Sequence, residues 1–490
     1  MPRNLTEAFL SSLRKLMDEG DVVPSRNGDS KEIYCHQVRI DHPEERVIMT
    51  PARGANIMAQ LAEAMWIMGG RDDMEFLSRY LPRARDYSDD GETWRAGYGP
   101  RLRAWPLGDN PSVHSVTNPA PDKQVDQVEE CLKLLCENLE TRRAVAVIFD
   151  PARDFCESKD IPCNNWLHFL VRDGKLNLTV GVRSNDAIWG FSGINMFEWS
   201  VLMQMMAHWL DIEVGKMVYT ASSFHLYEYH FDKAEKILAR DKGKTLYEWG
   251  FRPPTFSTGW EDFGPAMAEF FNLEEKIAEG SLPYEDIDLV TDEFLRTVLH
   301  MLNIHACFQS GSPIEDLVWH VSSLPECDLK VGAIDWLMRQ KRMRKEGGFL
   351  KLIRPKLSPE MAAYFDWYVQ PQKYVELPYV FEVLKVLHHK KTLSYGDSWK
   401  KHGEILGLFS NITRKRDRIT SLAAGAQGTA DEGILDTLSD LCVYAAKYIT
   451  LIAELYPVAF MDYLRSPDYQ VVYPCEVDVY LPGDVNQTVA

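Results

Sequence analysis

Apolar and polar residues alternate along two neighbouring segments, which predicts a β-hairpin. Asp173 and Gly174 lie between these segments and form a pair typical of a tight hairpin turn. Because successive side chains of a strand point to opposite faces, Arg183 should lie on the face opposite the apolar one. We therefore expect Arg183 to face a polar space. The apolar positions that define the hairpin are Leu167, Phe169, Val171, Leu176, Leu178, Val180 and Val182.

Longer apolar patterns predict helices and further strands in the first half of the chain. Residues 5–17 and 55–68 have helical periodicity, and the second segment ends at Gly69 and Gly70. Residues 194–210 are apolar nearly all round and predict a central buried helix whose methionines belong to the core. Residues 32–40 resemble a strand, and the apolar run 144–149 predicts a buried strand. The residues beyond about 255 are mainly helical.

Composition and charge narrow the classes of function. The chain has 490 residues, enough for two or three domains, and a formal net charge of -18. This charge disfavours direct nucleic-acid binding but is compatible with a local basic pocket for one phosphate. Nine cysteines without a Cys-x-x-Cys pair indicate reduced thiols, and no apolar run reaches about 18 residues. We expect a cytoplasmic protein that does not enter the membrane and binds a nucleotide-sized anion.

Three features suggest chemistry, and each has a structural alternative. Cys163 follows Pro162 at the start of the hairpin, where a nearby Arg183 would favour its thiolate, although a single cysteine is commonly a small buried hydrophobe. Glu63 lies in an apolar helix, so its carboxylate either points to water or is buried with a raised pKa. Arg142 and Arg143 either grip a phosphate or are a solvated basic pair.

Taken together and in order, these features resemble the thymidylate synthase family. The resemblance covers about residues 5 to 255 and implies an α/β (α+β) fold, with a mixed sheet packed with helices and followed by an all-α C-terminal region. The motifs that carry it are Arg26, Glu63-x-x-Trp66, Tyr98-Gly99, Trp105-Pro106, Arg142-Arg143, Pro162-Cys163, Arg183-Ser184-x-Asp186-x-x-x-Gly190 and His225-Leu226-Tyr227.

The resemblance implies transfer of a one-carbon unit from 5,10-methylenetetrahydrofolate to C5 of a pyrimidine nucleotide monophosphate. Cys163 would add to C6 and thereby make C5 nucleophilic. Glu63 would relay protons through water to the base, and Tyr98 would assist proton removal at C5.

The family also implies roles in binding. Arg26, Arg183 and Ser184 would hold the 5′-phosphate. Arg142 and Arg143 would join them from the second subunit of a homodimer. The remaining contacts would be Asp186 to the folate pterin, and His225 and Tyr227 to the sugar 3′-hydroxyl.

Two departures from the family pattern concern the product. The family usually has His after the catalytic cysteine, whereas this chain has Asn164. Ala84 and Tyr87 stand where synthases commonly have Trp, a residue that packs on the exocyclic methylene intermediate. Without that wall, water can reach the intermediate and give hydroxymethyl instead of methyl. We therefore predict a C5 hydroxymethyltransferase, with methyl transfer to form dTMP as the alternative.

The base is predicted from the amide at the central helix. Asn195 is displaced by one residue from the frame of the family asparagine that pairs with uracil. An amide presents both a donor and an acceptor to uracil, whereas a carboxylate suits the cytosine amino group. We expect dUMP to be favoured over dCMP.

The second half of the chain is divided by pattern alone. We predict a catalytic domain at 1–260, a helical extension at 261–370 and an all-α domain at 371–490 that resembles the nucleotide-modification-associated domain of phage enzymes. Asp436 and Asp440 share a helix face and would bind Mg²⁺, with Glu382 and Asp417 as further candidate ligands; solvated carboxylates are the alternative. Such a protein would act in a phage-infected host cytoplasm. Two other classes of function stay open: a nucleotide-binding protein without catalysis, and a scaffold for other modification enzymes.

Overall fold

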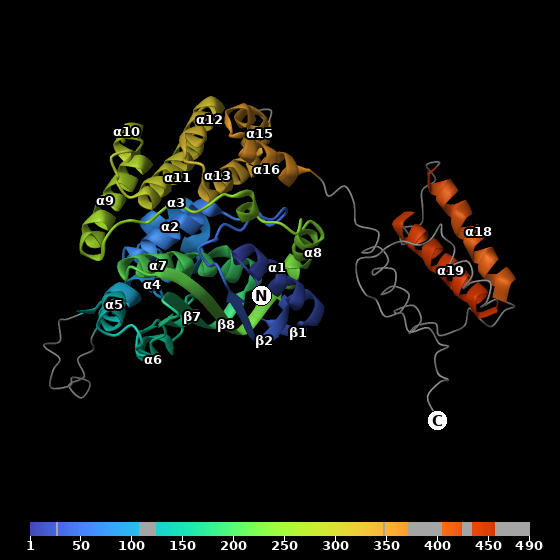
Figure 1. The fold of residues 1–490 in the computed structure, drawn as a ribbon, viewed down its shortest axis with the longest axis horizontal. Helices are drawn as coiled ribbons and strands as arrows, with labels where there is room; N and C mark the ends of the chain where they lie inside the picture. Colours follow the sequence, from blue (N-terminus) through green and yellow to red (C-terminus); the bar gives the residue numbers. More distant parts are fainter. Residues whose placement is uncertain (26–27, 107–123, 346–347, 371–403, 424–433, 456–490) are drawn as a thin grey trace, which may run out of the picture. The chain divides into compact units, whose positions relative to one another are not determined.

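The computed structural model describes residues 1–25, 28–106, 124–345, 348–370, 404–423 and 434–455 (Figure 1). The predicted phosphate ligand Arg26 and the candidate metal ligand Glu382 lie outside these residues. The chain divides into two compact units, Met1–Pro371 and Gln372–Ala490. Among the described residues, no helix is long and apolar enough to cross a membrane.

A six-stranded sheet forms the centre of the first unit, in the order β1-β2-β8-β7-β6-β5. Neighbouring strands are antiparallel except β7 and β8, which are parallel. The sheet is therefore mixed, as predicted. Its strands are β1 Asp21–Ser25, β2 Gly28–Ile40, β5 Val145–Val147, β6 Asn164–Arg172, β7 Lys175–Asp186 and β8 Glu213–Tyr227, and a separate pair is formed by β3 Trp105–Pro106 and β4 Gln124–Val125.

The predicted hairpin is confirmed as β6 and β7. Asp173 and Gly174 have φ angles of 54° and 70°, which are the positive values that a tight two-residue turn needs. The apolar side of β7 is buried, with Leu176, Leu178 and Val180 each 0% exposed. Arg183 is exposed, as the period of two predicts.

The strand predicted at 144–149 exists, but the prediction that it is buried on both faces is wrong. Ala146 is 0% exposed, whereas Val145 and Val147 are each 42% exposed. The reason is its place in the sheet: β5 is the edge strand, and only one of its faces meets the core.

Three predicted helices pack beside the sheet, and their bounds lie close to the predicted ones. Helices α1 Leu5–Glu19 and α7 Met196–Trp209 lie on one face of the sheet, and α2 Ile57–Met68 packs on α7 (Figure 1). The methionines of α7 are 0–1% exposed and belong to the core. The remaining elements of this layer and its edges are α3 Met74–Tyr80, η1 Pro82–Tyr87, α4 Tyr98–Arg103, α5 Gln127–Glu137, α6 Pro151–Asp154, η2 Ala187–Asn195, η3 Glu228–His230, α8 Phe231–Ala239 and η4 Leu246–Trp249.

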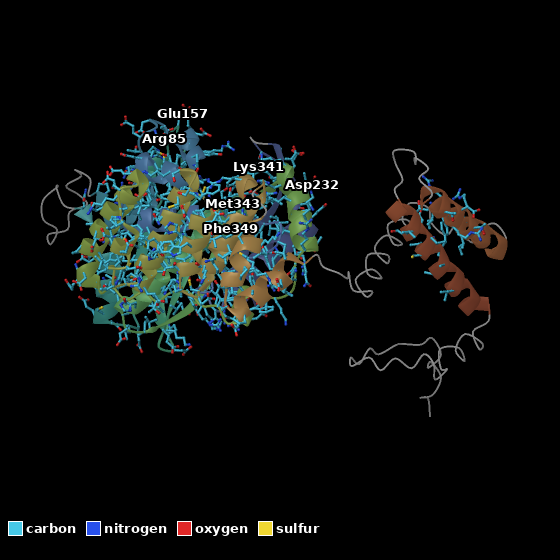
Figure 2. The ribbon with its side chains drawn as sticks, turned by 90° about the horizontal axis from the view of Figure 1, so that it is seen from above. Arg85, Glu157, Asp232, Lys341, Met343 and Phe349 are labelled. Atoms are coloured by element: carbon cyan, nitrogen blue, oxygen red, sulfur yellow. The ribbon has the colours of Figure 1, made fainter. Side chains whose placement is uncertain are left out.

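The predicted helical extension packs against the outer side of α2 (Figure 1). Glu274 accepts hydrogen bonds from Arg79 at 2.8 Å and Tyr80 at 2.6 Å, and it thereby ties the extension to α3. Met343 and Phe349, labelled in Figure 2, are buried within it. Its helices are α9 Trp260–Glu279, α10 Tyr284–Ile287, α11 Glu293–Gln309, α12 Ile314–Ser323, α13 Asp328–Arg339, α14 Lys341–Lys345, α15 Phe349–Ile353, η5 Arg354–Lys356 and α16 Pro359–Val369.

Residues 1–260 and the extension thus lie in one compact unit, and the division between units falls after Pro371. Independent folding of 1–260 stays a prediction. The second unit contains two helices that pack on each other, α18 Glu404–Ala423 and α19 Ile434–Leu455.

Candidate active site

Cys163 lies in the loop that enters β6, and Arg183 holds this loop in place. The Arg183 backbone N–H donates to the Cys163 carbonyl at 2.9 Å. Its guanidinium donates to the carbonyls of Pro162 and Ile161, each at 2.9 Å. The structure therefore brings the predicted nucleophile and the predicted phosphate ligand together at one end of the hairpin.

Arg183 favours the Cys163 thiolate, as expected, but burial of the thiol outweighs this effect. Burial raises the pKa of the Cys163 thiol, and this is the largest effect. Arg183 does lower that pKa, as expected, but Asp160 opposes it by raising it. The thiol is thus protonated at neutral pH, and catalysis requires a group nearby that accepts its proton.

Asn164, the residue that departs from the family pattern, connects two aromatic side chains behind the thiol. It is 0% exposed; its amide N–H donates to the Tyr98 hydroxyl at 2.9 Å, and its oxygen accepts from the Trp199 indole N–H at 3.0 Å. Tyr98 and Trp199 also stack, with ring centroids 5.7 Å apart. Because Tyr98 already accepts from Asn164, its own O–H proton is free to point elsewhere.

Two other carboxyl groups lie near Glu63: Glu198, which is buried, and Asp160, which is half-buried like Glu63 itself. Burial and, secondly, the charge of Asp160 raise the pKa of Glu63 to about 8. Burial, then Glu63, raise the pKa of Glu198 well above its ordinary value, and burial also raises the pKa of Asp160 to about 6. The raised pKa favours a protonated Glu63 at neutral pH, which agrees with the second of the two alternatives, and a carboxyl group of this kind can give and take a proton.

Asn195 reaches the interior through an irregular helix. Residues Ala187–Asn195 form a π-helix, whose i→i+5 hydrogen bonds accommodate one residue more than an α-helical turn. Asn195 is the last residue of this π-helix. Its amide accepts from Asn185 Nδ2 at 2.8 Å and donates to Glu198 at 2.9 Å.

Asp186, Ser184, His225 and Tyr227 lie at the carboxyl ends of the two parallel strands. Asp186 pairs with His225 across β7 and β8, and Ser184 pairs with Ser223. One carboxylate oxygen of Asp186 accepts from backbone N–H groups of the π-helix, while the other is buried with no partner among the described residues. The structure brings these predicted ligands together beside the exposed rings of Trp189 and Tyr229.

The two positions where synthases commonly have Trp differ in their exposure. Ala84 is buried at 1% exposure inside η1, whereas Tyr87 is 52% exposed and close enough to Tyr229 to raise its pKa.

Ser158 and Lys159 donate to Asp89, and these bonds join the segments that carry Arg85 and Glu157 at one rim of the unit (Figure 2).

Arg142 and Arg143 are exposed beside the edge strand β5, and neither guanidinium has an ion pair among the described residues. They are not brought to Cys163 within this chain by any contact. Their contribution from a second subunit stays a prediction.

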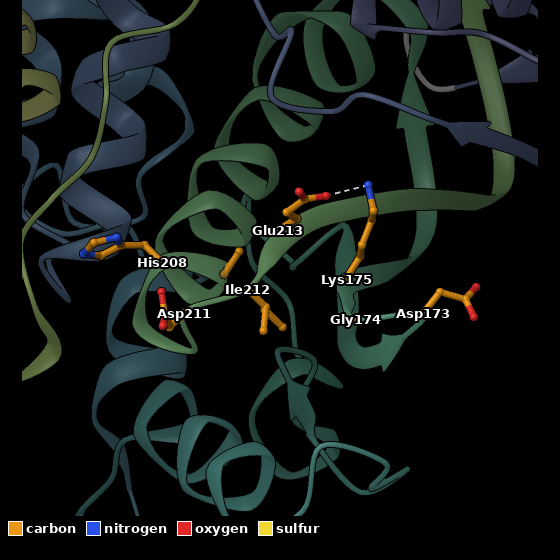
Figure 3. A pocket seen from close by; sticks show the side chains of 8 residues that line it. Asp173, Gly174, Lys175, His208, Asp211, Ile212 and Glu213 are labelled. Carbon is orange, nitrogen blue, oxygen red and sulfur yellow. Dashed lines mark ion pairs between the residues drawn. The ribbon is translucent and has the colours of Figure 1, made fainter.

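One hollow lies away from Cys163. It has a volume of about 580 Å³ at the hairpin turn, around Asp173, Lys175 and Glu213, and an exposed 2.6 Å ion pair joins the last two (Figure 3). This end of β7 is opposite to the end that carries Arg183. We assign the chemistry to the Cys163 end, because the nucleophile and the buried carboxyls are there.

The magnesium prediction receives no support. Asp440 accepts from Lys415 at 2.7 Å, and Asp417 pairs with Arg416. The side chain of Asp436 lies outside the described residues. Among the residues that are described, no group of three or more candidate ligands is close enough to hold a metal ion.

The sequence reasoning missed Asp160, Asn185, Glu198, Trp199 and Tyr219. Glu198 had a usable signal, because it is the single carboxylate in an otherwise apolar helix. Tyr219 is 1% exposed, and its hydroxyl lacks a partner among the described residues. The others depend on contacts between distant segments.

Gly99 allows the close approach that places Tyr98. A Cβ at this position would lie 2.5 Å from the Arg71 carbonyl oxygen and 2.7 Å from its nitrogen. Gly99→Ala is therefore expected to lower the stability by about 1–3 kcal/mol, because backbone must move to relieve the overlap. Denaturant unfolding of the variant, with Gly259→Ala as a control in open space, measures this.

Comparisons with known proteins agree with this geometry. A family model described as thymidylate synthase matches residues 7–252. Deoxyuridylate hydroxymethyltransferase of Bacillus phage SP01 is 29% identical over 359 residues, which cover 68% of this chain and 92% of the phage protein. The protein of the same name from Pseudomonas phage M6 is 30% identical over 351 residues, with 69% and 93% covered. A third, from Delftia phage PhiW-14, is 28% identical over 250 residues, with 49% and 64% covered.

Proposed function

Because the chain belongs to the thymidylate synthase family, we propose that this transferase hydroxymethylates C5 of dUMP through a covalent bond between Cys163 and C6. The observation that carries the proposal is the Cys163 loop, fixed by Arg183 beside Tyr98, Asn164 and the buried carboxyls. The names of the phage relatives support hydroxymethyl as the transferred group and dUMP as the acceptor.

Cys163 activates a carbon that is otherwise a poor nucleophile. Addition of its thiolate to C6 would place the electron pair on C5, which then bonds the one-carbon unit of methylenetetrahydrofolate. Loss of the C5 proton and departure of tetrahydrofolate, which takes the electrons of its bond to the one-carbon unit, would leave an exocyclic methylene group on C5. Water adds to the resulting exocyclic methylene carbon, and the sulfur leaves C6. The product is 5-hydroxymethyl-dUMP, and no hydride is consumed.

Proton transfers fall to Glu63 and Tyr98. A carboxyl group with a pKa of about 8 exchanges protons readily at neutral pH, so Glu63 serves as the relay to the base through water. Tyr98, whose hydroxyl oxygen is held by Asn164, assists removal of the C5 proton. Asn164 positions Tyr98 without a charge of its own.

The residues at the carboxyl ends of β7 and β8 fit a folate. The unpartnered oxygen of Asp186 suits the donor groups of a pterin, and the exposed rings of Trp189 and Tyr229 suit its flat face. Methylenetetrahydrofolate would supply the one-carbon unit. Tyr227 stacks on Tyr229 and meets His225 edge to face, and His225 and Tyr227 would hold the sugar 3′-hydroxyl.

A homodimer would complete the phosphate site formed by Arg26, Arg183 and Ser184. The outer face of the sheet carries exposed Val145, Val147 and Trp166, which a second copy would cover. Arg142 and Arg143 lie at the edge of this face and would reach the partner's nucleotide.

The dimer proposal predicts complementation between inactive variants. Cys163→Ser and the double variant Arg142→Ala with Arg143→Ala should each be weakly active alone. Mixed after reversible dissociation, they should recover about a quarter of the wild-type activity, because each mixed dimer has one complete site. If mixed dimers form but activity does not recover, both arginines act in the active site of their own subunit or in no active site.

Product identification tests the function. Mass spectrometry of the nucleotide formed from dUMP or dCMP with methylenetetrahydrofolate should show 5-hydroxymethyl-dUMP without dihydrofolate. A methylated product with stoichiometric dihydrofolate would establish the alternative, a dTMP-forming synthase. Binding of dUMP without any product would reduce the chain to a nucleotide-binding protein.

A further inference from the structure

We propose that Asn185 and Glu198 clamp the Asn195 amide in one orientation, and that this clamp makes the enzyme select a 4-oxo over a 4-amino pyrimidine. The proposal deepens the function above and rests on it. Neither Asn185 nor Glu198 touches the base in this account; both are positioning residues that act through Asn195.

The clamp has two ends that differ in chemistry. Asn185, on β7, donates its amide N–H to the Asn195 oxygen at 2.8 Å. Glu198, in the first turn of α7, accepts from the Asn195 nitrogen at 2.9 Å. Reversal of the Asn195 amide alone would put its NH₂ group against the NH₂ group of Asn185.

All three side chains are buried: Asn185 is 2% exposed, Asn195 6% and Glu198 0%. A mismatched polar contact at such a depth is costly, because water cannot replace the lost partner. The Asn195 amide therefore keeps its orientation, because the reversed orientation has a higher free energy.

Each clamp residue also has an atom without a partner. Asn185 Oδ1 and Glu198 Oε2 make no hydrogen bond among the described residues, although both are buried. Burial and the nearby Glu63 raise the pKa of Glu198, which favours the neutral form of its carboxyl group. It can donate as well as accept.

The orientation of Asn195 decides which base fits. After the clamp bonds are made, one amide N–H and one oxygen lone pair remain. Uracil offers the O4 acceptor next to the N3–H donor, whereas cytosine offers the N4 amino donor next to the N3 acceptor. An amide fixed for uracil thus meets cytosine with donor against donor and acceptor against acceptor.

A pair of substitutions of similar size at position 198 tests the clamp. Glu198→Gln keeps the accepting oxygen, and the ratio of kcat/KM for dUMP over dCMP should stay within about threefold of the wild type. Glu198→Leu removes it, and the ratio should fall roughly 10-fold, because one bond no longer opposes reversal. Both values of kcat/KM are measured on one preparation. A partly unfolded fraction lowers both equally, so the ratio does not change.

Asn185→Asp gives the sharpest result. A carboxylate at 185 accepts and does not donate, so the Asn195 nitrogen should turn toward it and the oxygen toward the proton of Glu198. The reversed amide matches cytosine, and the ratio of dUMP over dCMP should fall roughly 100-fold.

The outcomes separate this inference from the proposed function. If the wild type hydroxymethylates neither nucleotide, the function fails. If it acts on dUMP but Glu198→Leu and Asn185→Asp both keep the wild-type ratio, the function stands and the clamp is refuted.

Discussion

Cys163→Ser is expected to lower product formation by at least about 10⁴-fold while the chain still binds dUMP. A serine hydroxyl has nearly the size of the thiol but is a far weaker nucleophile toward C6, so the covalent step is lost. The Arg183 bonds to the loop use backbone carbonyls of Pro162 and Ile161 and do not depend on the sulfur. Single-turnover rates and a separate measurement of dUMP binding distinguish the two effects.

Cys156→Ser is the matched control, because Cys156 is an exposed free thiol outside the site. It should behave as the wild type. A Cys163→Ser variant that retains a tenth or more of the wild-type rate would exclude nucleophilic catalysis by this residue.

Glu63→Gln is expected to have the second-largest effect, a loss of about 10²–10⁴-fold in kcat. The amide keeps the shape of the carboxyl group but cannot exchange protons with the base through water. The loss should appear in kcat more than in KM, because the group acts on the reaction and not on phosphate binding.

The same substitution should change the pH dependence of stability. The pKa of Glu63 is raised to about 8, so its protonated form stabilises the fold, and this contribution is lost as the pH rises through about 8. Relative to the wild type, Glu63→Gln should gain roughly 2–4 kcal/mol in unfolding free energy between pH 6 and pH 9. Denaturant unfolding at both pH values measures it, with exposed Glu137→Gln as the control.

Equal pH dependence in Glu63→Gln and the wild type would mean that Glu63 is ionised in the fold. The relay role would then lose its physical basis.

Local patterns predicted the parts of the fold that local chemistry determines. The hairpin follows from alternation and the Asp173-Gly174 turn, and α2 and α7 follow from their apolar periodicity. The run at 144–149 was misjudged because apolar composition does not distinguish a strand in the sheet centre from an edge strand whose outer side is exposed.

The residues of the site that belong to family motifs could be predicted from the sequence. The contacts between side chains from distant segments could not. Cys163 and Arg183 could be paired from one hairpin. The displacement of Asn195 was visible in the sequence, whereas the π-helix that ends at Asn195 was not predicted. The bonds from Asn164 to Tyr98 and Trp199 join segments more than thirty residues apart, and no local rule predicts them.

Intact-protein mass spectrometry with 5-fluoro-dUMP and methylenetetrahydrofolate tests the central claim most directly, because fluorine at C5 blocks proton loss and traps the covalent complex. The account predicts a stable adduct of enzyme, nucleotide and folate in the wild type, located on the peptide that contains Cys163 and missing from Cys163→Ser. An adduct on another residue, or turnover of dUMP by a wild-type enzyme that forms no adduct, would contradict it.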